Sequence, residues 1–153
     1  MNKVRKVVFE RDIKALVYDK TCAHGCQTVS ILFEEETYHI NLYGKSKNDR
    51  FGIFGQTLLT IASGLNDSAL IRSLVDCGVK INGRNANKET PLIVASRKGN
   101  KEAVITLLEL GAKIKCRCFS GSETALKCAI RNGHNDIADI IRKETKRRKR
   151  RQE

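Results

Sequence analysis

Proline, tryptophan and aromatic side chains in general are scarce in this chain of 153 residues. One proline occurs, tryptophan is absent, and aromatic residues make up 5% of the sequence. So few rings offer little to the core of a large β-sandwich or to a surface that stacks nucleic-acid bases. The composition therefore argues against both of these classes.

Long apolar segments are also missing. No run of 18 apolar residues occurs, so the sequence predicts no membrane-spanning helix. The N-terminal segment has only the short apolar run Val7-Val8-Phe9 before Glu10, which does not fit a secretory signal. Without such a signal, the six cysteines are expected to be reduced thiols. We therefore expect an intracellular protein that works in the nucleus, the cytoplasm or both.

Charge, by contrast, is plentiful and unevenly spread. Apolar residues make up 41% of the chain and charged residues 30%, which suits one packed domain with a solvated surface. The formal net charge is +12, and residues 142–153 carry eight basic and two acidic side chains. Half of the net charge thus belongs to the last twelve residues. An excess of this kind favours acidic partners.

Three stretches of the chain resemble one another. Thr57, Thr90 and Thr124 each open a similar short apolar stretch, at steps of 33 and 34 residues. Residues 74–81 also match residues 107–114 at a step of 33. A fixed period of this length indicates an array of repeats.

The middle repeat predicts two short helices. Thr90 suits an N-cap, and Pro91 suits the first helical position because it has no amide hydrogen to leave unpaired. Gly99 allows a tight turn between the helices, and Gly111 ends the second helix in a left-handed conformation. The apolar stripes of the two helices consist of Leu92 and Ala95, and of Ala103, Val104, Leu107 and Leu108.

This pattern resembles the ankyrin repeat over about residues 53–143, divided near 53–85, 86–119 and 120–143. The resemblance implies a mainly α fold, a helix-turn-helix repeat solenoid with protruding hairpin loops. It also implies a non-enzymatic module that binds a protein partner through its concave face and loops. The position that is usually His in this family holds Thr60, Ile93 and Lys127, so we expect no imidazole bonds between repeats there.

The first 52 residues do not match the repeat. Apolar residues alternate with polar ones over residues 28–43, which predicts a β-hairpin with an acidic turn. We interpret residues 1–52 as a divergent N-terminal cap that covers the first repeat. A small partner-binding extension is the alternative. The alternating apolar positions are Val29, Ile31, Phe33, Tyr38, Ile40 and Leu42.

Residues that could carry chemistry are few. Cys22, His24 and Cys26 have a spacing that zinc ligands can adopt, but no second cysteine pair completes a set of four. We expect no metal and no cofactor. The chain has three histidines, and none is placed beside a nucleophile in a recognisable pattern. The sequence therefore predicts that the protein is not an enzyme.

The residues expected to bind a partner lie in the loops and near the ends of the first helices, where we expect exposed side chains. The anticipated partner is an acidic protein, and the chain itself is expected to be a monomer. The candidate contact residues are Arg84, Asn85, Arg97, Lys98, Arg117, Phe119 and Arg131.

Residues 144–153 form a basic C-terminal tail in this interpretation. Three roles remain open: a nuclear-import signal, a contact with nucleic acid or another anionic surface, and a solvated helix end with no binding role. Binding of nucleic acid or an anionic surface through this tail is the alternative function. Because the tail follows the last apolar position, Ile141, replacing its arginines is expected to leave folding intact. Its run of six cations is Lys146, Arg147, Arg148, Lys149, Arg150 and Arg151.

Overall fold

In a computed structural model of the chain, the described residues contain six helices in three stacked pairs. The structure describes residues 48, 50, 55–118 and 123–152, and the backbone of three strands in residues 15–18, 28–33 and 36–41. The helices are α1 (Leu58–Gly64), α2 (Ser68–Asp76), α3 (Pro91–Lys98), α4 (Lys101–Glu109), α5 (Ala125–Arg131) and α6 (Asn135–Arg150).

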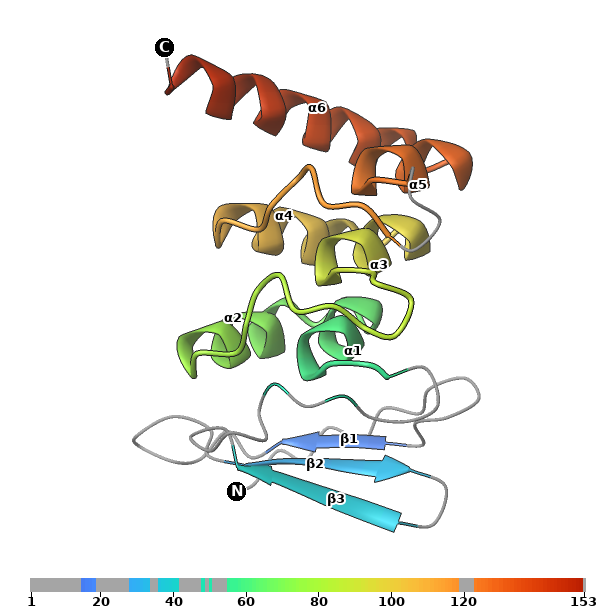
Figure 1. The fold of residues 1–153 in the computed structure, drawn as a ribbon, viewed down its shortest axis with the longest axis vertical. Helices are drawn as coiled ribbons and strands as arrows, with labels where there is room; N and C mark the ends of the chain where they lie inside the picture. Colours follow the sequence, from blue (N-terminus) through green and yellow to red (C-terminus); the bar gives the residue numbers. More distant parts are fainter. Residues whose placement is uncertain are drawn as a thin grey trace.

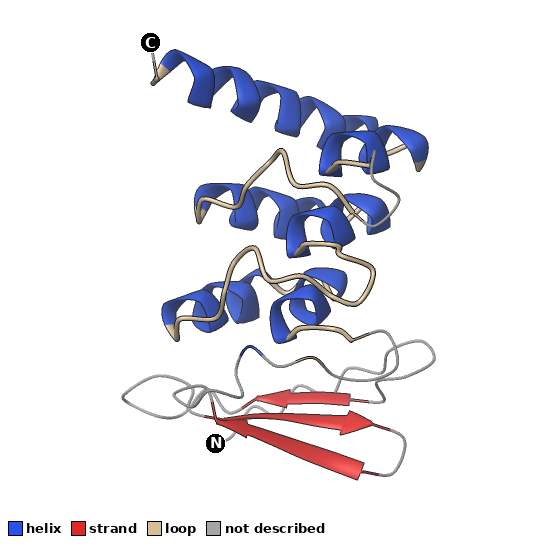
Figure 2. Cartoon of the chain, viewed as in Figure 1, coloured by secondary structure: helices blue, strands red, loops and turns tan. Residues whose placement is uncertain are grey.

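The pairs stack so that like helices lie on one another (Figure 1). Helix α1 contacts α3 and α3 contacts α5, while α2 contacts α4 and α4 contacts α6. Figure 2 shows the long loops between pairs on one side of these two helical layers. The prediction of a mainly α repeat solenoid is confirmed. Within the described residues, no helix has both the length and the apolar character needed to cross a membrane.

Each first helix begins at the predicted threonine. Thr57, Thr90 and Thr124 are N-caps, and each side chain accepts a hydrogen bond from a backbone N–H three residues later. Pro91 is the first residue of α3, and Gly99 closes that helix in the left-handed region with φ 77°. The local signals in the sequence therefore placed these helix ends correctly.

The core is one continuous cluster that runs through all three helix pairs, from Leu58 in α1 to Ile141 in α6. Since neighbouring pairs supply the other half of each apolar contact, no pair buries its own stripe alone. The residues predicted to form the two stripes of the middle repeat are all buried: Leu92, Ala95, Ala103, Val104, Leu107 and Leu108.

Side chains at the start of the second helices join each repeat to the one before it. Asn100, the N-cap of α4, donates from Nδ2 to the carbonyl oxygens of Ser63 (2.8 Å) and Gly64 (3.0 Å). His134, the N-cap of α6, has Nε2 3.3 Å from the carbonyl oxygen of Arg97. Arg97 follows Gly64 by 33 residues and His134 follows Asn100 by 34, so the contact repeats. An imidazole thus does link two repeats, at a position other than the one considered in the sequence.

Three antiparallel strands lie at the α1–α2 end of the stack (Figure 1). They are β1 (Ala15–Tyr18), β2 (Thr28–Phe33) and β3 (Glu36–Asn41), with β2 in the centre. Phe33 pairs with Glu36 across β2 and β3. The strand side chains and the turn at residues 34–35 lie outside the described residues. The capping role of residues 1–52 therefore stays a prediction.

Helix α6 is longer than its counterparts because the stop signal of the earlier repeats is missing. Gly78 and Gly111, with φ of 81° and 89°, follow the ends of α2 and α4. Thr145 stands at the corresponding place in the third repeat and donates to the carbonyl oxygen of Ile141 at 2.7 Å. The helix continues to Arg150, so the segment expected as a separate tail is the second half of α6.

Replacing Gly99 with alanine tests the packing between repeats. Gly99 and Gly133 share a φ of 77°, but a Cβ at Gly99 would lie 2.5 Å from His134 Cε1, whereas a Cβ at Gly133 meets nothing within 4 Å. Both variants should lose about 1–2 kcal/mol of unfolding free energy from the left-handed backbone. Gly99→Ala should lose about 1 kcal/mol more, because His134 must shift. Denaturant unfolding measures both, and equal losses would contradict the contact.

Candidate partner-binding surface

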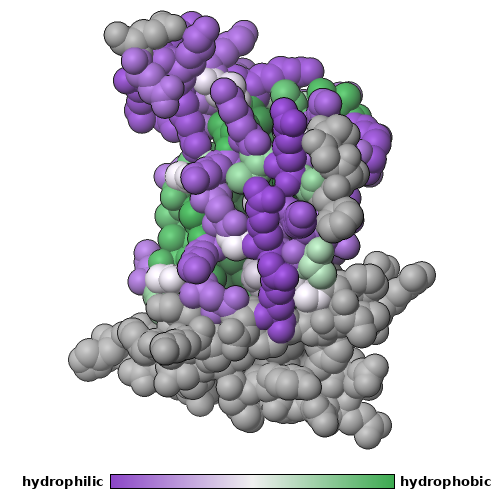
Figure 3. All heavy atoms as spheres, viewed as in Figure 1, coloured by the Kyte–Doolittle hydropathy of each residue, from purple (hydrophilic) through white to green (hydrophobic). Residues whose placement is uncertain are grey.

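Exposed arginines recur at the same place in successive loops. Arg50, Arg84 and Arg117 are spaced by 34 and 33 residues, and all three are exposed. Arg84 Nη1 donates to the carbonyl oxygen of Arg117 at 3.4 Å, which ties neighbouring loops together. Figure 3 shows a column of strongly hydrophilic side chains along the loop side of the stack. We call these three residues the arginine ladder. Arg50 was missed in the sequence, although the repeat step points to it.

Hydrogen bonds between loops keep the ladder in register. Asn48 Oδ1 accepts from the backbone N–H of Lys80, and Asn82 Oδ1 accepts from that of Lys113, both at 2.9 Å. The two asparagines are 34 residues apart and the two lysines 33. Because each loop binds the next through the same bond, the arginine positions follow the period of the stack.

Asn85 was predicted to be an exposed contact residue, and the predicted exposure is wrong because its side chain is fully buried. Its Nδ2 donates to Glu89 Oε2, and its Oδ1 accepts from the Glu89 backbone N–H, both at 2.9 Å. Asn85 therefore closes the loop that leads into Thr90. The Asn-to-Glu spacing of four residues was the signal available in the sequence.

Arg97 and Arg131 have partners within their own repeats. Arg97 Nε lies 3.0 Å from Glu89 Oε1, and Arg131 forms the equivalent ion pair with Glu123. Both pairs join a residue just before the first helix to a residue eight positions later. Arg97 is half-buried, whereas Arg131 is exposed. These two arginines thus hold helix ends in place, and any contact with a partner would be additional.

The other candidates divide between exposed sites and sites outside the described residues. Lys98 is exposed at the end of α3 and Arg117 is exposed in its loop. Phe119, like Cys22, His24 and Cys26, lies outside the described residues. In residues 48, 50, 55–118 and 123–152, no three His, Cys, Asp or Glu side chains gather as metal ligands do.

The thiol of Cys128 is held in its protonated form. Burial raises the pKa of Cys128 to about 11, and the neighbouring Glu123 carboxylate adds to the shift. The side chain is almost completely buried in the core. A thiol of this kind is a poor nucleophile at neutral pH, so Cys128 serves packing.

Arg148 anchors the second half of α6 to the preceding repeat. Its Nη2 donates to the carbonyl oxygen of Leu108 (2.8 Å) and its Nη1 to that of Ala112 (2.7 Å). The guanidinium thus binds one carbonyl near the end of α4 and one in the loop that follows this helix. The sequence predicted that the arginines of residues 144–153 can be replaced without cost to folding, whereas these contacts lead us to expect a cost for Arg148.

Glu144 also binds the guanidinium of Arg148. Its Oε1 accepts from Arg148 Nε at 2.7 Å, and its Oε2 lies 2.6 Å from Arg147 Nε. The hydrogen bond from Arg147 lowers the pKa of Glu144, and Arg148 adds to the lowering against the opposite effect of burial. Glu144 therefore remains ionised when folded at a pH where an ordinary glutamate begins to take up a proton.

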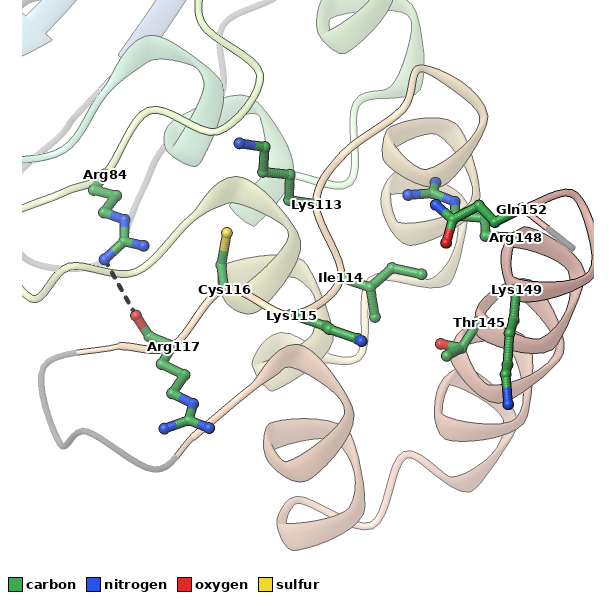
Figure 4. A pocket seen from close by; sticks show the side chains of 10 residues that line it. All are labelled: Arg84, Lys113, Ile114, Lys115, Cys116, Arg117, Thr145, Arg148, Lys149 and Gln152. Carbon is green, nitrogen blue, oxygen red and sulfur yellow. Dashed lines mark hydrogen bonds between the residues drawn. The ribbon is translucent and has the colours of Figure 1, made fainter.

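The second half of α6 presents two different basic faces. Arg148 and Lys149 face a groove of about 870 Å³ between α6 and the loop after α4 (Figure 4). Lys146, Arg147, Arg150 and Arg151, together with Lys143, surround a smaller hollow of about 430 Å³. The run of six cations, which the sequence presents as one patch, is therefore divided between two faces.

The larger groove is lined by cations from three elements. Of the ten lining residues within the described part of the chain, six are Lys or Arg and none is acidic. It includes Arg84 and Arg117 of the ladder, so the ladder continues into it. In Figure 4, Ile114 extends from the loop toward α6. The lining residues are Arg84, Lys113, Ile114, Lys115, Cys116, Arg117, Thr145, Arg148, Lys149 and Gln152.

Glu144→Gln should destabilise the protein in a pH-dependent way. A carboxyl whose pKa is lowered on folding stabilises the folded state above its unfolded pKa, near 4.5, and loses this contribution as the pH falls further. At pH 7 the variant should lose about 0.5–1 kcal/mol of unfolding free energy. The difference from the wild type should shrink as the pH drops below that value. Urea unfolding across this pH range provides the measurement.

Asp139→Asn is the matched control, since it removes the exposed Arg142–Asp139 pair, three residues apart on the same helix. It should change stability less than Glu144→Gln at pH 7. A Glu144→Gln loss that stays constant down to low pH would contradict the proposed ionisation of Glu144.

Parts of this chain are similar to a protein family and to known proteins. The sequence model of a family described as ankyrin repeats (3 copies) matches residues 20–118 and 59–150. The ankyrin repeat protein FPV031 of Fowlpox virus (strain NVSL) is 36% identical over 87 residues, which cover 56% of this chain and 26% of that protein. The BRCA1-associated RING domain protein 1 of Caenorhabditis elegans is 34% identical over 87 residues, which cover 57% of this chain and 12% of that protein. The chain thus matches about a quarter or less of each relative's length.

Proposed function

The chain belongs to the ankyrin-repeat family, and we propose that it binds an acidic protein partner through the loop side of its stack, without catalysing a reaction. Ankyrin repeats are generally protein–protein interaction modules. The proposal adds the chemistry of the partner and the surface that meets it. We further propose that the chain acts as a monomeric adaptor or regulator in the nucleus, the cytoplasm or both.

The arginine ladder is the observation that carries this proposal. Arg50, Arg84 and Arg117 are exposed at regular intervals along one side of the stack. A guanidinium offers several donors in a fixed plane and binds carboxylates in pairs of hydrogen bonds. Arginine is also enriched among the residues that dominate binding energy at protein interfaces. A rigid stack that repeats this group favours a partner with carboxylates along an extended surface.

Binding of nucleic acid through α6 is the second candidate. The hollow surrounded by Lys143, Lys146, Arg147, Arg150 and Arg151 favours it, because clustered cations attract a phosphate backbone. Arg147, however, is already paired with Glu144. A protein that uses this face for phosphates should show a steep fall of affinity with salt.

Charge reversal on the ladder tests the protein-binding proposal. After affinity capture and purification of a partner, the double variant Arg84→Glu/Arg117→Glu should bind it at least about tenfold more weakly than the wild type. The variant Lys143→Glu/Lys146→Glu makes the same change in net charge on the other face and should keep affinity within about twofold. Isothermal titration measures both affinities, and circular dichroism shows whether each variant is folded.

The control pair also decides between the two candidates. If Lys143→Glu/Lys146→Glu abolishes tight, salt-sensitive binding of an oligonucleotide and the ladder variant leaves partner binding unchanged, the protein-binding proposal is wrong. Unchanged partner binding in the ladder variant alone also overturns the role given to the ladder.

A further inference from the structure

We propose that the groove between α6 and the loop after α4 binds an acidic peptide segment that carries an apolar side chain. This inference rests on the proposed function and deepens it, because it assigns one segment of the partner to one site. The groove exists because α6 continues beyond the length of α2 and α4. The side of the groove that α6 forms is therefore a feature of this chain's last repeat.

Charge selects the class of ligand. Arg84, Lys113, Lys115, Arg117, Arg148 and Lys149 line the groove, and none of the ten lining residues that the structure describes carries a carboxylate. Lys113, Lys115 and Lys149 form no ion pair with any residue that the structure describes. Like charges that line a hollow concentrate a positive electrostatic potential there. This potential attracts an anionic ligand, and the bound ligand reduces the repulsion between the cations.

Arg148 lines the groove, but it is not the main donor of hydrogen bonds to a bound anion. Its three donor nitrogens are already bonded to Glu144, Leu108 and Ala112. These bonds join the second half of α6 to the preceding repeat at one wall of the groove. Lys113 and Lys115 of the loop and Lys149 of α6 therefore bind the ligand from opposite sides.

The lining between the cations selects a peptide over a nucleic acid. Ile114, Cys116 and Thr145 place methyl, methylene and thiol groups among the charges. Ile114 is half-buried and extends from the loop toward α6 (Figure 4). None of the ten described residues that line the groove is aromatic, whereas sites for single-stranded nucleic acid usually stack bases on aromatic rings. An acidic segment with one apolar side chain satisfies both the charges and the apolar lining.

The size of the groove agrees with this ligand. Its volume of about 870 Å³ falls within the range of roughly 300–1,000 Å³ that is usual for ligand sites in proteins. Such a space holds the side chains of a short segment, while the rest of the partner can extend along the arginine ladder. The groove and the ladder then form one continuous surface, joined at Arg84 and Arg117.

The test uses the full chain and short fluorescein-labelled peptides made of glutamates around one central leucine. Fluorescence anisotropy should show saturable binding that weakens with added salt. Replacing the glutamates with glutamine should abolish binding, and replacing the leucine with alanine should weaken it several-fold. The variant Lys113→Glu/Lys149→Glu should bind at least about tenfold more weakly. The control Lys143→Glu/Lys146→Glu should stay within about twofold.

Several outcomes would overturn the assignment. Equal losses in the two double variants would mean that net charge alone attracts the peptide. A single-stranded oligonucleotide that binds more tightly than the peptide, and loses affinity with Lys113→Glu/Lys149→Glu, would make the groove a nucleic-acid site. Absence of saturable binding to the peptide would leave the groove without the proposed ligand.

Failure of this inference can be told from failure of the proposed function. If a purified partner depends on Arg84 and Arg117 but tolerates Lys113→Glu/Lys149→Glu, the module binds its partner without the groove. If the peptide binds the groove while no partner depends on the ladder, the groove proposal stands and the ladder proposal falls. Circular dichroism of each variant shows that a loss of binding is not a loss of fold.

Discussion

Burial of apolar surface between neighbouring repeats is the constraint on which the rest of this structure depends. Each helix pair is too small to enclose its own apolar stripe, and the core is continuous from α1 to α6. Polar side chains make the stacking specific. Asn100 and His134 reach the carbonyl ends of the first helix in the preceding repeat. The regular spacing of the surface arginines is a consequence of this regular stacking.

A stack must also end, and the way it ends shapes the candidate binding site. In the third repeat Thr145 replaces the glycine that would stop the helix, so α6 continues past the loop of the second repeat. Arg148 then bonds to one carbonyl oxygen near the end of α4 and one in the loop after it. These bonds hold α6 beside the loop, and a basic groove lies between them. The segment that docks α6 thus also forms one wall of the proposed binding groove.

Local signals in the sequence predicted more of this structure than long-range ones did. Thr90, Pro91 and Gly99 act within a few residues of themselves, and their roles were predictable from helix-capping chemistry. Asn85 was misjudged because its burial depends on how the loop folds around Glu89. Arg148 was misjudged because its acceptors lie 36 and 40 residues away in the chain. Residue type alone does not show whether a basic side chain is solvated or bonds to a carbonyl group.

The docking of the second half of α6 is the central claim, and amide hydrogen exchange at residues 145–150 tests it most directly. If Arg148 and Glu144 hold this segment against the second repeat, its amides should exchange far more slowly than those of an unstructured peptide. The variant Arg148→Met, which keeps an apolar stem but removes the donors, should then speed exchange in this segment while α3 and α4 remain protected. Exchange at residues 145–150 of the wild type as fast as in an unstructured peptide would contradict the account.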